Sequence, residues 1–352
     1  MVVLLAVVLL GGLVWLVRRQ RGSDMPGRAD EVPHRLPDLP FGGRQIPEGQ
    51  LPAGQIVVSC LTKQYSNVKA VDNLSFVVEP GRVTGFLGPN GAGKTTTLRM
   101  LLDLVTPTAG KATIGGVRYA DLDQPIRCVG GILDASAAHK GRTGRNHLRI
   151  ICQSAGIPLA RADEVLQLVG LSAAGNRKVK GYSLGMLQRL GVAAALIGDP
   201  QVLILDEPAN GLDPEGIRWM RDLLKAMAAR GRTILVSSHL LSEVELLADD
   251  LVIIASGQLV TQGSVASVLQ SMAHGSRVLV RTPDVAGLMA AIDGDAVATP
   301  AGDGDVHITG ADAVTIGDAA QRAGVAIHQL VTERPDLEGV FLELTRGKAE
   351  IR

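Results

Sequence analysis

The sequence predicts an α/β fold followed by a smaller α+β unit. Two apolar runs, Val83–Leu87 and Val202–Leu205, lead directly into glycine-rich or acidic residues. That pattern is typical of buried parallel strands that end at a ligand site. From about Gly275 onward, short strand and helix patterns alternate instead. The chain has 352 residues and 46% hydrophobic content, more than one ordinary domain requires and enough for a large core.

A complete phosphate-binding loop follows the first apolar run. Residues 88–96 match the spacing G-x-x-x-x-G-K-[ST], and residues 96–102 are expected to be helical. Glycines let such a loop turn its backbone N–H groups toward phosphate oxygens at the positive end of a helix. A plain tight turn is the alternative, but the flanking strand and helix favour nucleotide binding. The predicted nucleotide contacts are Gly88, Asn90, Gly91, Ala92, Gly93, Lys94, Thr95 and Thr96, with Lys94 also on the β- and γ-phosphates and Thr95 on Mg²⁺.

Two acidic residues end the second apolar run. Asp206 and Glu207 follow Val202–Leu205, so they are expected at the sheet edge where open α/β folds bind ligands. Asp206 suits the shell of Mg²⁺, directly or through water. Glu207 suits a general base that polarises the attacking water. The alternative is a plain strand with a polar cap. Because a phosphate loop is also present in the sequence, this alternative is the less favoured of the two.

Three further motifs identify the family. They are Tyr182–Arg189 (Tyr-Ser-Leu-Gly-Met-Leu-Gln-Arg), Asn210–Asp213 and Ser237–His239. With the phosphate loop and the Asp-Glu strand, they occur in the order typical of the nucleotide-binding subunits of ABC transporters, which the chain resembles from Ile56 to about Ser271. The form of the first motif, and the segment 337–344, look like the drug- and antibiotic-export ATPases that pair with ABC-2 type permeases.

The resemblance implies a P-loop NTPase fold of the ABC type, with ATP and Mg²⁺ as cofactors. It also implies a head-to-tail homodimer in which Ser183 and Gly185 contact the γ-phosphate bound by the other protomer. Asp213 would belong to the D-loop between the two sites, and His239 would contact the γ-phosphate and orient water near Glu207. The structural alternatives are a helix N-cap at Ser183, a helix-terminal acid at Asp213 and a structural histidine.

Two predicted site residues depart from simple expectations. Tyr65 lies where the family places an aromatic residue that stacks on adenine, and only 3% of the chain is aromatic. A strand-edge tyrosine is the alternative. Asp134 stands where the family has a glutamine. A carboxylate can still bind Mg²⁺ or its water shell, so Asp134 is included among the predicted metal ligands.

Charge and cysteine content narrow the function classes. The formal net charge is +0, which argues against a nucleic-acid partner. Cys60, Cys128 and Cys152 form neither an even disulfide set nor a metal-binding spacing, so they fit a reducing compartment. The basic segment 140–149 reads as a solvated face, and the resemblance adds the alternative that it receives a cytoplasmic helix of the permease.

The amino terminus carries an apolar run without charge. Met1–Val17 is followed by Arg18, Arg19 and Arg21, and as a helix it would reach roughly 25 Å, the lower limit for a membrane span. We predict an anchor over residues 1–21 with the ATPase on the cytoplasmic face of the cell membrane. A start site at Met25 is the alternative. Residues 22–54, rich in proline and glycine, are expected to form a flexible linker.

We predict two further regions: an ATPase domain at 55–274, with a helical insert at about 134–189, and an accessory domain at 275–346. The accessory domain has the order βαββαβα, which predicts a ferredoxin-like fold. Its expected strand 325–330 precedes a final helix whose apolar face, formed by Leu337, Val340, Phe341 and Leu344, is either core or a dimer contact.

We therefore predict an ATP-hydrolysing subunit that powers export of a drug-, antibiotic- or lipid-like substrate through a separate integral-membrane ABC-2 type permease. The alternative is a non-transport ABC ATPase with a regulatory or mechanical role. Chromosome-type members carry long heptad arms and translation-type members carry two ATPase units, whereas this sequence has one such unit and no arms. The transported molecule would contact the permease rather than this chain.

Overall fold

The computed structural model describes residues 54–134, 138–272, 277–292, 296–302, 305–333 and 337–345. The predicted anchor, and all of the predicted linker except Gly54, lie outside these residues. Within the described ranges, no helix combines the length and the apolar character needed to cross a membrane.

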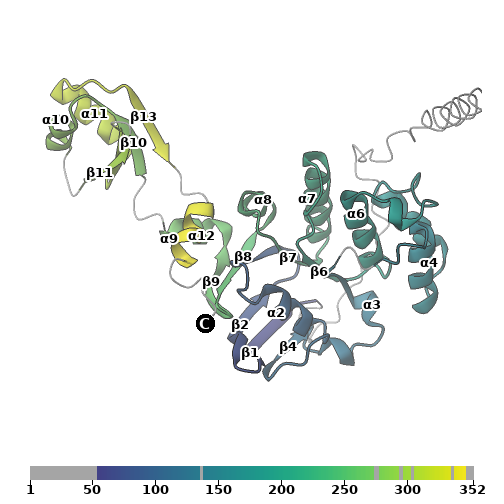
Figure 1. The fold of residues 1–352 in the computed structure, drawn as a ribbon. Coiled ribbons are helices and arrows are strands. Elements are labelled where there is room, and N and C mark those ends of the chain that lie inside the picture. The colour runs from purple at the N-terminus through teal and green to yellow at the C-terminus, as the bar shows by residue number, and fades with distance from the viewer. Residues whose placement is uncertain are drawn as a thin grey trace, which may run out of the picture.

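A six-stranded sheet runs through the centre of the ATPase region (Figure 1). Its order is β5-β6-β7-β3-β8-β9, and all neighbours are parallel except β8 and β9. Because β3 lies beside β7 and β7 beside β6, the three segments that follow these strands meet at one sheet edge. The strands are β3 (Val83–Leu87), β5 (Val129–Ile132), β6 (Val202–Asp206), β7 (Thr233–Ser237), β8 (Asp250–Ala255) and β9 (Gln258–Ser264).

A second, antiparallel sheet of order β2-β1-β4 packs with α2 (Lys94–Leu101) against the first. Phe76 of β2 and Phe86 of β3 join the two sheets, with ring centroids 5.3 Å apart. This contact backs the strand that leads into the phosphate loop. The strands are β1 (Ile56–Tyr65), β2 (Val68–Val78) and β4 (Ala109–Ile114).

A helical region lies between β5 and β6 in the sequence. It shares one apolar cluster with α7 (Pro214–Ala228). The buried Tyr182 hydroxyl donates to the backbone oxygen of Ala174 at 2.8 Å, which fixes the chain just before α6. The helices are α4 (Gly144–Ser154), α5 (Ala160–Leu168) and α6 (Leu184–Ala195), preceded by the short α3 (Pro125–Cys128).

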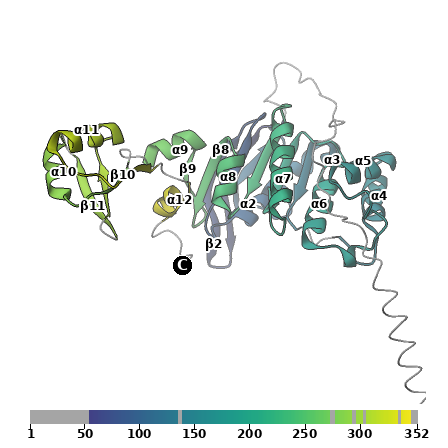
Figure 2. The same cartoon turned by 90° about the horizontal axis from the view of Figure 1, so that it is seen from above.

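A four-stranded antiparallel sheet of order β11-β12-β10-β13 forms the carboxyl-terminal unit. With α10 and α11 packed on it, this is the predicted ferredoxin-like arrangement. Figures 1 and 2 both show it at the opposite end of the molecule from α4. Its elements are β10 (Arg277–Arg281), α10 (Val285–Ala291), β11 (Val297–Gly302), β12 (Asp305–Thr309), α11 (Ala313–Ala323) and β13 (Gln329–Glu333).

The expected strand at 325–330 is wrong in its position. Strand β13 begins at Gln329, where the chain meets Arg281 at the end of β10. Before that point, Gly324 adopts a positive φ of 68° as the cap of α11, and Val325 still donates to Ala320 in that helix. The helix cap therefore occupies residues that the sequence pattern assigned to the strand.

The last helix, α12 (Leu337–Thr345), packs against α8 (Leu241–Leu247) and α9 (Val265–Met272) of the ATPase region. Leu337 and Val340 are buried in a cluster with Val244 and Leu251. Of the two alternatives for the apolar face of this helix, core packing is the one observed.

Candidate functional site

The phosphate loop requires glycine at two positions for steric reasons. A Cβ at Gly88 would lie 2.5 Å from the backbone oxygen of Ile254, and a Cβ at Gly93 would lie 2.4 Å from that of Ala70. Gly93 also has a φ of +98°. Both approaches are too close for any side chain, so the loop can follow this path only with glycine. Asn90 and Gly91 at its tip are exposed.

Lys94 folds back over this loop. Its Nζ donates to the backbone oxygens of Gly88 at 2.5 Å and Pro89 at 3.2 Å. Burial lowers the pKa of Lys94, while the negative charges of Glu207 and Asp206 act in the opposite direction. The ammonium group therefore contacts the loop and is within reach of the charges of Asp206, at the end of β6, and of Glu207, which follows it.

Asp206, the last residue of β6, is bonded to the first turn of α2 and to the end of β7 at the sheet edge. The Thr95 hydroxyl donates to Asp206 Oδ2 at 2.8 Å, and the Ser237 hydroxyl donates to Oδ1. Hydroxyl and carboxylate oxygens at this spacing are the hard donors that Mg²⁺ prefers. The donor set thus fits the predicted metal. The contact of Ser237 was missed by the sequence analysis, although the motif Ser237–His239 contained it.

Glu207 and His239 form a second pair beside this group. Glu207 Oε2 lies 2.7 Å from His239 Nδ1 and accepts the His239 backbone N–H at 3.3 Å. Glu207 has a φ of +50°, which is uncommon for a residue with a side chain. Its backbone N–H donates to the backbone oxygen of Ser237 at 3.2 Å, and Gln188 of α6 donates to its backbone oxygen at 3.1 Å. These bonds hold the unusual conformation, and Gln188 is a second residue that the sequence analysis did not select.

The signature residues lie at the start of α6, in the helical region. Both cartoon views place α6 well away from α2 (Figures 1 and 2). Ser183 is the N-cap of α6 and accepts from the Met186 backbone at 3.2 Å. A Cβ on Gly185 would lie 3.1 Å from the backbone oxygen of Gly211, so the signature packs closely on the D-loop. Asp213 caps α7 by accepting from Gly216 at 2.8 Å.

Tyr65 and Asp134 lie at separate margins of the site. Tyr65 ends β1 with 48% of its surface exposed, and Lys63 Nζ lies 5.0 Å from its ring centroid. Asp134, just beyond β5, lines a groove of about 340 Å³. Burial and the charge of Arg142 lower the pKa of His147, which also lines this groove.

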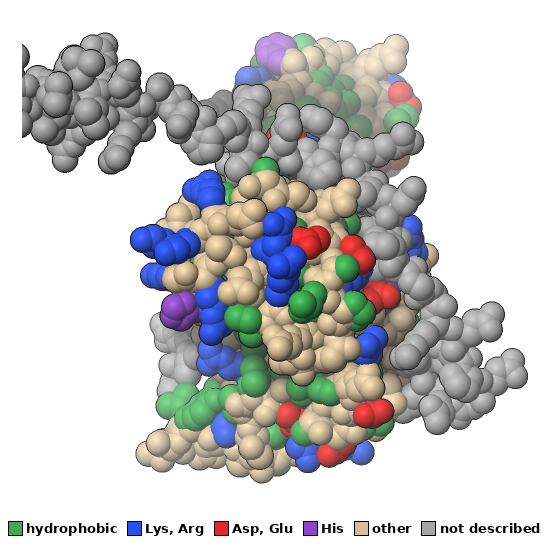
Figure 3. Space-filling view, turned by 90° about the vertical axis from the view of Figure 1, so that its right-hand side faces the viewer, with side chains coloured by type: hydrophobic (Ala, Val, Ile, Leu, Met, Phe, Trp, Pro, Cys, Tyr) green, Lys and Arg blue, Asp and Glu red, His purple; other side chains and the backbone are tan. Residues whose placement is uncertain are grey.

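The helical region beside this groove presents a basic surface. Lys140, Arg142 and Arg149 are exposed, and Figure 3 shows Lys and Arg side chains gathered on that face of the molecule. The Asp163 carboxylate pairs with Arg145 at 2.6 Å and with Arg149 at 3.4 Å.

Comparisons with known proteins agree with this geometry. The ABC transporter family matches residues 71–210, and a domain of unknown function matches residues 276–338. The bacitracin transport ATP-binding protein BcrA of Bacillus licheniformis is 46% identical over 205 residues, which are 57% of this chain and 67% of BcrA. The daunorubicin resistance ATP-binding protein DrrA3 of Streptomyces coeruleorubidus is 34% identical over 314 residues, which are 84% of this chain and 98% of DrrA3.

Solved structures show the same fold. An ATP-binding subunit of an ABC transporter superposes with a TM-score of 0.57 at 28% identity, covering 61% of this chain and 92% of that subunit. A dimeric ATP-binding cassette bound to ADP and phosphate superposes with a TM-score of 0.53 at 22% identity, covering 60% and 98%. With a relative matched over almost its whole length, the chain belongs to the family of ABC transporter ATP-binding subunits.

Proposed function

We propose that this chain binds and hydrolyses ATP to power export of a drug-, antibiotic- or lipid-like substrate through a separate ABC-2 type permease. The observation that carries the proposal is the meeting of the phosphate loop with Asp206, Glu207 and His239 at one sheet edge. Two relatives are a bacitracin transport and a daunorubicin resistance ATP-binding protein, which supports export of antibiotics.

In the proposed mechanism, backbone N–H groups of residues 88–96 and the Lys94 ammonium bind the triphosphate. Thr95 and Asp206 would hold Mg²⁺, either directly or through water, and the bound ion would neutralise charge on the β- and γ-phosphates. Asp134 is proposed as a further ligand of Mg²⁺ or of its water shell. Tyr65 is proposed to stack on adenine, since its exposed ring is available for that contact.

Hydrolysis then depends on Glu207. The carboxylate accepts a proton from the attacking water as the water oxygen bonds to the γ-phosphorus and the bond to the ADP oxygen breaks. His239 Nδ1 lies 2.7 Å from Glu207. We assign His239 to orient this carboxylate and to donate to the γ-phosphate.

We propose a head-to-tail dimer that places Ser183 and Gly185 over the ATP of the partner protomer. Ser183 is exposed at the N-terminus of α6, and the neighbouring Leu184 is 59% exposed. A hydroxyl at a helix N-terminus suits contact with a phosphate, which the dimer would bring to it. Asp213 would line the same interface.

The groove beside Asp134 is the proposed contact for the permease. Apolar residues such as Leu133 and Leu190 line it, and the charge of the exposed Arg142 acts on His147 in its wall. Purification of the tagged full chain from detergent-solubilised native membranes tests this assignment. We expect an integral-membrane protein with several spans to co-purify, whereas recovery of soluble partners alone would contradict a role in export.

We also propose that the chain acts at the cytoplasmic face of the cell membrane and that residues 1–21 anchor it there. The uncharged run Met1–Val17 with arginines after it supports this. Deletion of residues 1–24 should release the chain into the soluble fraction when no permease is expressed. If the intact mass of the protein made from its native gene corresponds to a chain that starts at Met25, the anchor is ruled out.

A further inference from the structure

The short helix α8 connects the proposed switch residue to the rest of the molecule. It begins at Leu241, two residues after His239, and ends at Leu247. No side chain caps its first turn. An uncapped helix of seven residues is marginal in isolation, so its position depends on what packs against it. His239 is about half exposed and its Nδ1 lies 2.7 Å from Glu207 Oε2, so this contact depends on where the backbone leading into α8 places the ring.

Three consecutive residues of α8 contact three different elements. Glu243 pairs with Arg221 of α7 at 3.6 Å. Val244 packs on β3, where a Cβ at Gly85 would lie 2.6 Å from its Cγ1. Glu245 accepts the backbone N–H of Leu337, the first residue of α12, at 3.2 Å. The helix is therefore held from three sides, and α12 provides one of them.

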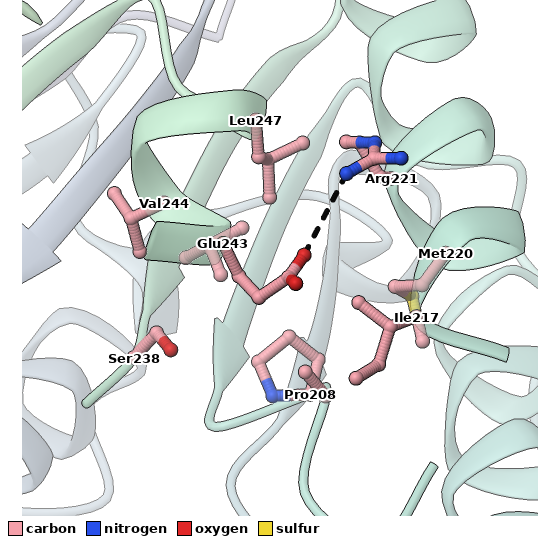
Figure 4. A pocket seen from close by; sticks show the side chains of 10 residues that line it. Pro208, Ile217, Met220, Arg221, Ser238, Glu243, Val244 and Leu247 are labelled. Atoms are coloured by element: carbon pink, nitrogen blue, oxygen red, sulfur yellow. Dashed lines mark ion pairs between the residues drawn. The ribbon is translucent and has the colours of Figure 1, made fainter. Parts of the chain in front are cut away.

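The support from α7 is the weakest. The ion pair between Arg221 and Glu243 is long and partly exposed, so it contributes little. Figure 4 shows this pair above a small pocket between α7 and α8. The pocket has a volume of about 30 Å³ and is lined by Pro208, Ile217 and Leu247, among others. Since Pro208 directly follows Glu207, α8 is incompletely packed against α7 on the side next to the proposed catalytic residue.

The support from α12 is the most apolar. Leu337 is 0% exposed and Val340 is 3% exposed. They share a cluster with Val244 of α8 and with Leu87, the residue immediately before Gly88 of the phosphate loop. Burial of two aliphatic side chains stabilises this contact far more than the exposed ion pair on the other side.

From these contacts we infer that α12 positions His239 for hydrolysis by holding α8 against β3. Leu337, Val340 and Glu245 are then positioning residues, and α12 ties the four-stranded carboxyl-terminal unit to the ATP site. The inference rests on the role proposed above for His239.

The test compares two truncations on the same helix in the full-length chain. Val340→Ala removes a buried contact, and Leu342→Ala removes a side chain that is 59% exposed. For Val340→Ala we expect kcat for ATP hydrolysis to fall about 10-fold with KM for ATP within about 2-fold of wild type, because the reacting groups are misplaced but the loop is intact. Leu342→Ala should leave both constants unchanged.

A double-mutant cycle with His239→Ala separates positioning from general destabilisation. If Val340 acts through His239, Val340→Ala should lower kcat no further in the His239→Ala background. Glu245→Ala, which keeps the apolar contact, should lower kcat in the same way, and Glu245→Gln should restore it because its amide oxygen still accepts a hydrogen bond. If Val340→Ala does not fold, judged by circular dichroism, the Glu245 pair decides the test.

Two outcomes overturn the inference. In the first, the fold-losses in kcat caused by Val340→Ala and His239→Ala multiply in the double variant. The α12 link is then wrong, while the role of His239 stands. If Val340→Ala does not fold, Glu245→Ala takes its place in this comparison. If His239→Ala retains wild-type turnover, the role of His239 is wrong and the positioning inference falls with it.

Discussion

Replacement of Glu207 by glutamine should separate ATP binding from hydrolysis. The glutamine side chain has the same shape, and its amide oxygen can still accept the His239 backbone N–H, now at 3.3 Å from Glu207 Oε2. It cannot accept a proton from water. A general base contributes at least about 10²-fold, so the barrier should rise by about 2.7 kcal/mol or more.

ATP affinity should survive this change. Lys94 contacts the backbone oxygens of Gly88 and Pro89 and makes no direct bond to the Glu207 side chain. The strained φ of +50° at residue 207 is held by backbone and Ser237 contacts that glutamine keeps. Fold stability should therefore change little.

The assay pairs phosphate release under saturating MgATP with filter binding of ATP. Glu164→Gln is the matched control, because Glu164 is 51% exposed and pairs with Arg161 in the helical region. We expect wild-type rates for the control and a loss of about 100-fold or more for Glu207→Gln. Wild-type turnover in the Glu207→Gln protein would refute the assignment of Glu207 as the base.

Three further predictions follow from the site and its surroundings. Gly93→Ala places a Cβ 2.4 Å from the Ala70 backbone oxygen at a φ of +98°. ATP binding in a filter assay should therefore be lost, and the free energy of unfolding from equilibrium denaturation should fall by about 2 kcal/mol. Unchanged binding would contradict the steric argument. Ser183→Arg, made in Glu207→Gln protein, should abolish ATP-dependent dimers in light scattering, and a persistent dimer would count against the sandwich. The pKa of His147 is lowered in the folded state, so acid favours the unfolded state, and the free energy of unfolding should fall as the pH drops below about 6.5. The fall should be smaller in His147→Gln. If denaturation gives both proteins the same change in unfolding free energy between pH 7 and pH 5, this prediction is refuted.

The sequence was most informative where a function depends on local spacing. The phosphate loop and the Asp206-Glu207 pair could be predicted because glycines and acids directly follow apolar runs that form β3 and β6. The parallel order of these strands then brings the two segments to one edge, as expected for an open α/β sheet. The ferredoxin-like order of the carboxyl-terminal unit could also be predicted, because strand and helix patterns alternate along its sequence.

Contacts between distant segments could not be predicted. Ser237 bonds to Asp206 only because β7 pairs with β6, and Gln188 reaches Glu207 from a helix that precedes β6. Where α12 packs on α8, the Leu337 backbone N–H donates to Glu245, a residue 92 positions earlier in the chain. Apolar spacing showed that one face of α12 is buried but carried no information on its partner. The displaced start of β13 has a similar cause, since pairing with Arg281 sets it.

The central claim, that this chain hydrolyses ATP at the phosphate loop, is tested most directly by phosphate release from MgATP with wild-type and Lys94→Ala protein. The account predicts turnover by the wild type, and background phosphate release with weakened ATP binding for Lys94→Ala, because the ammonium group is the loop's charged contact to the phosphates. Turnover by Lys94→Ala at the wild-type rate would contradict it.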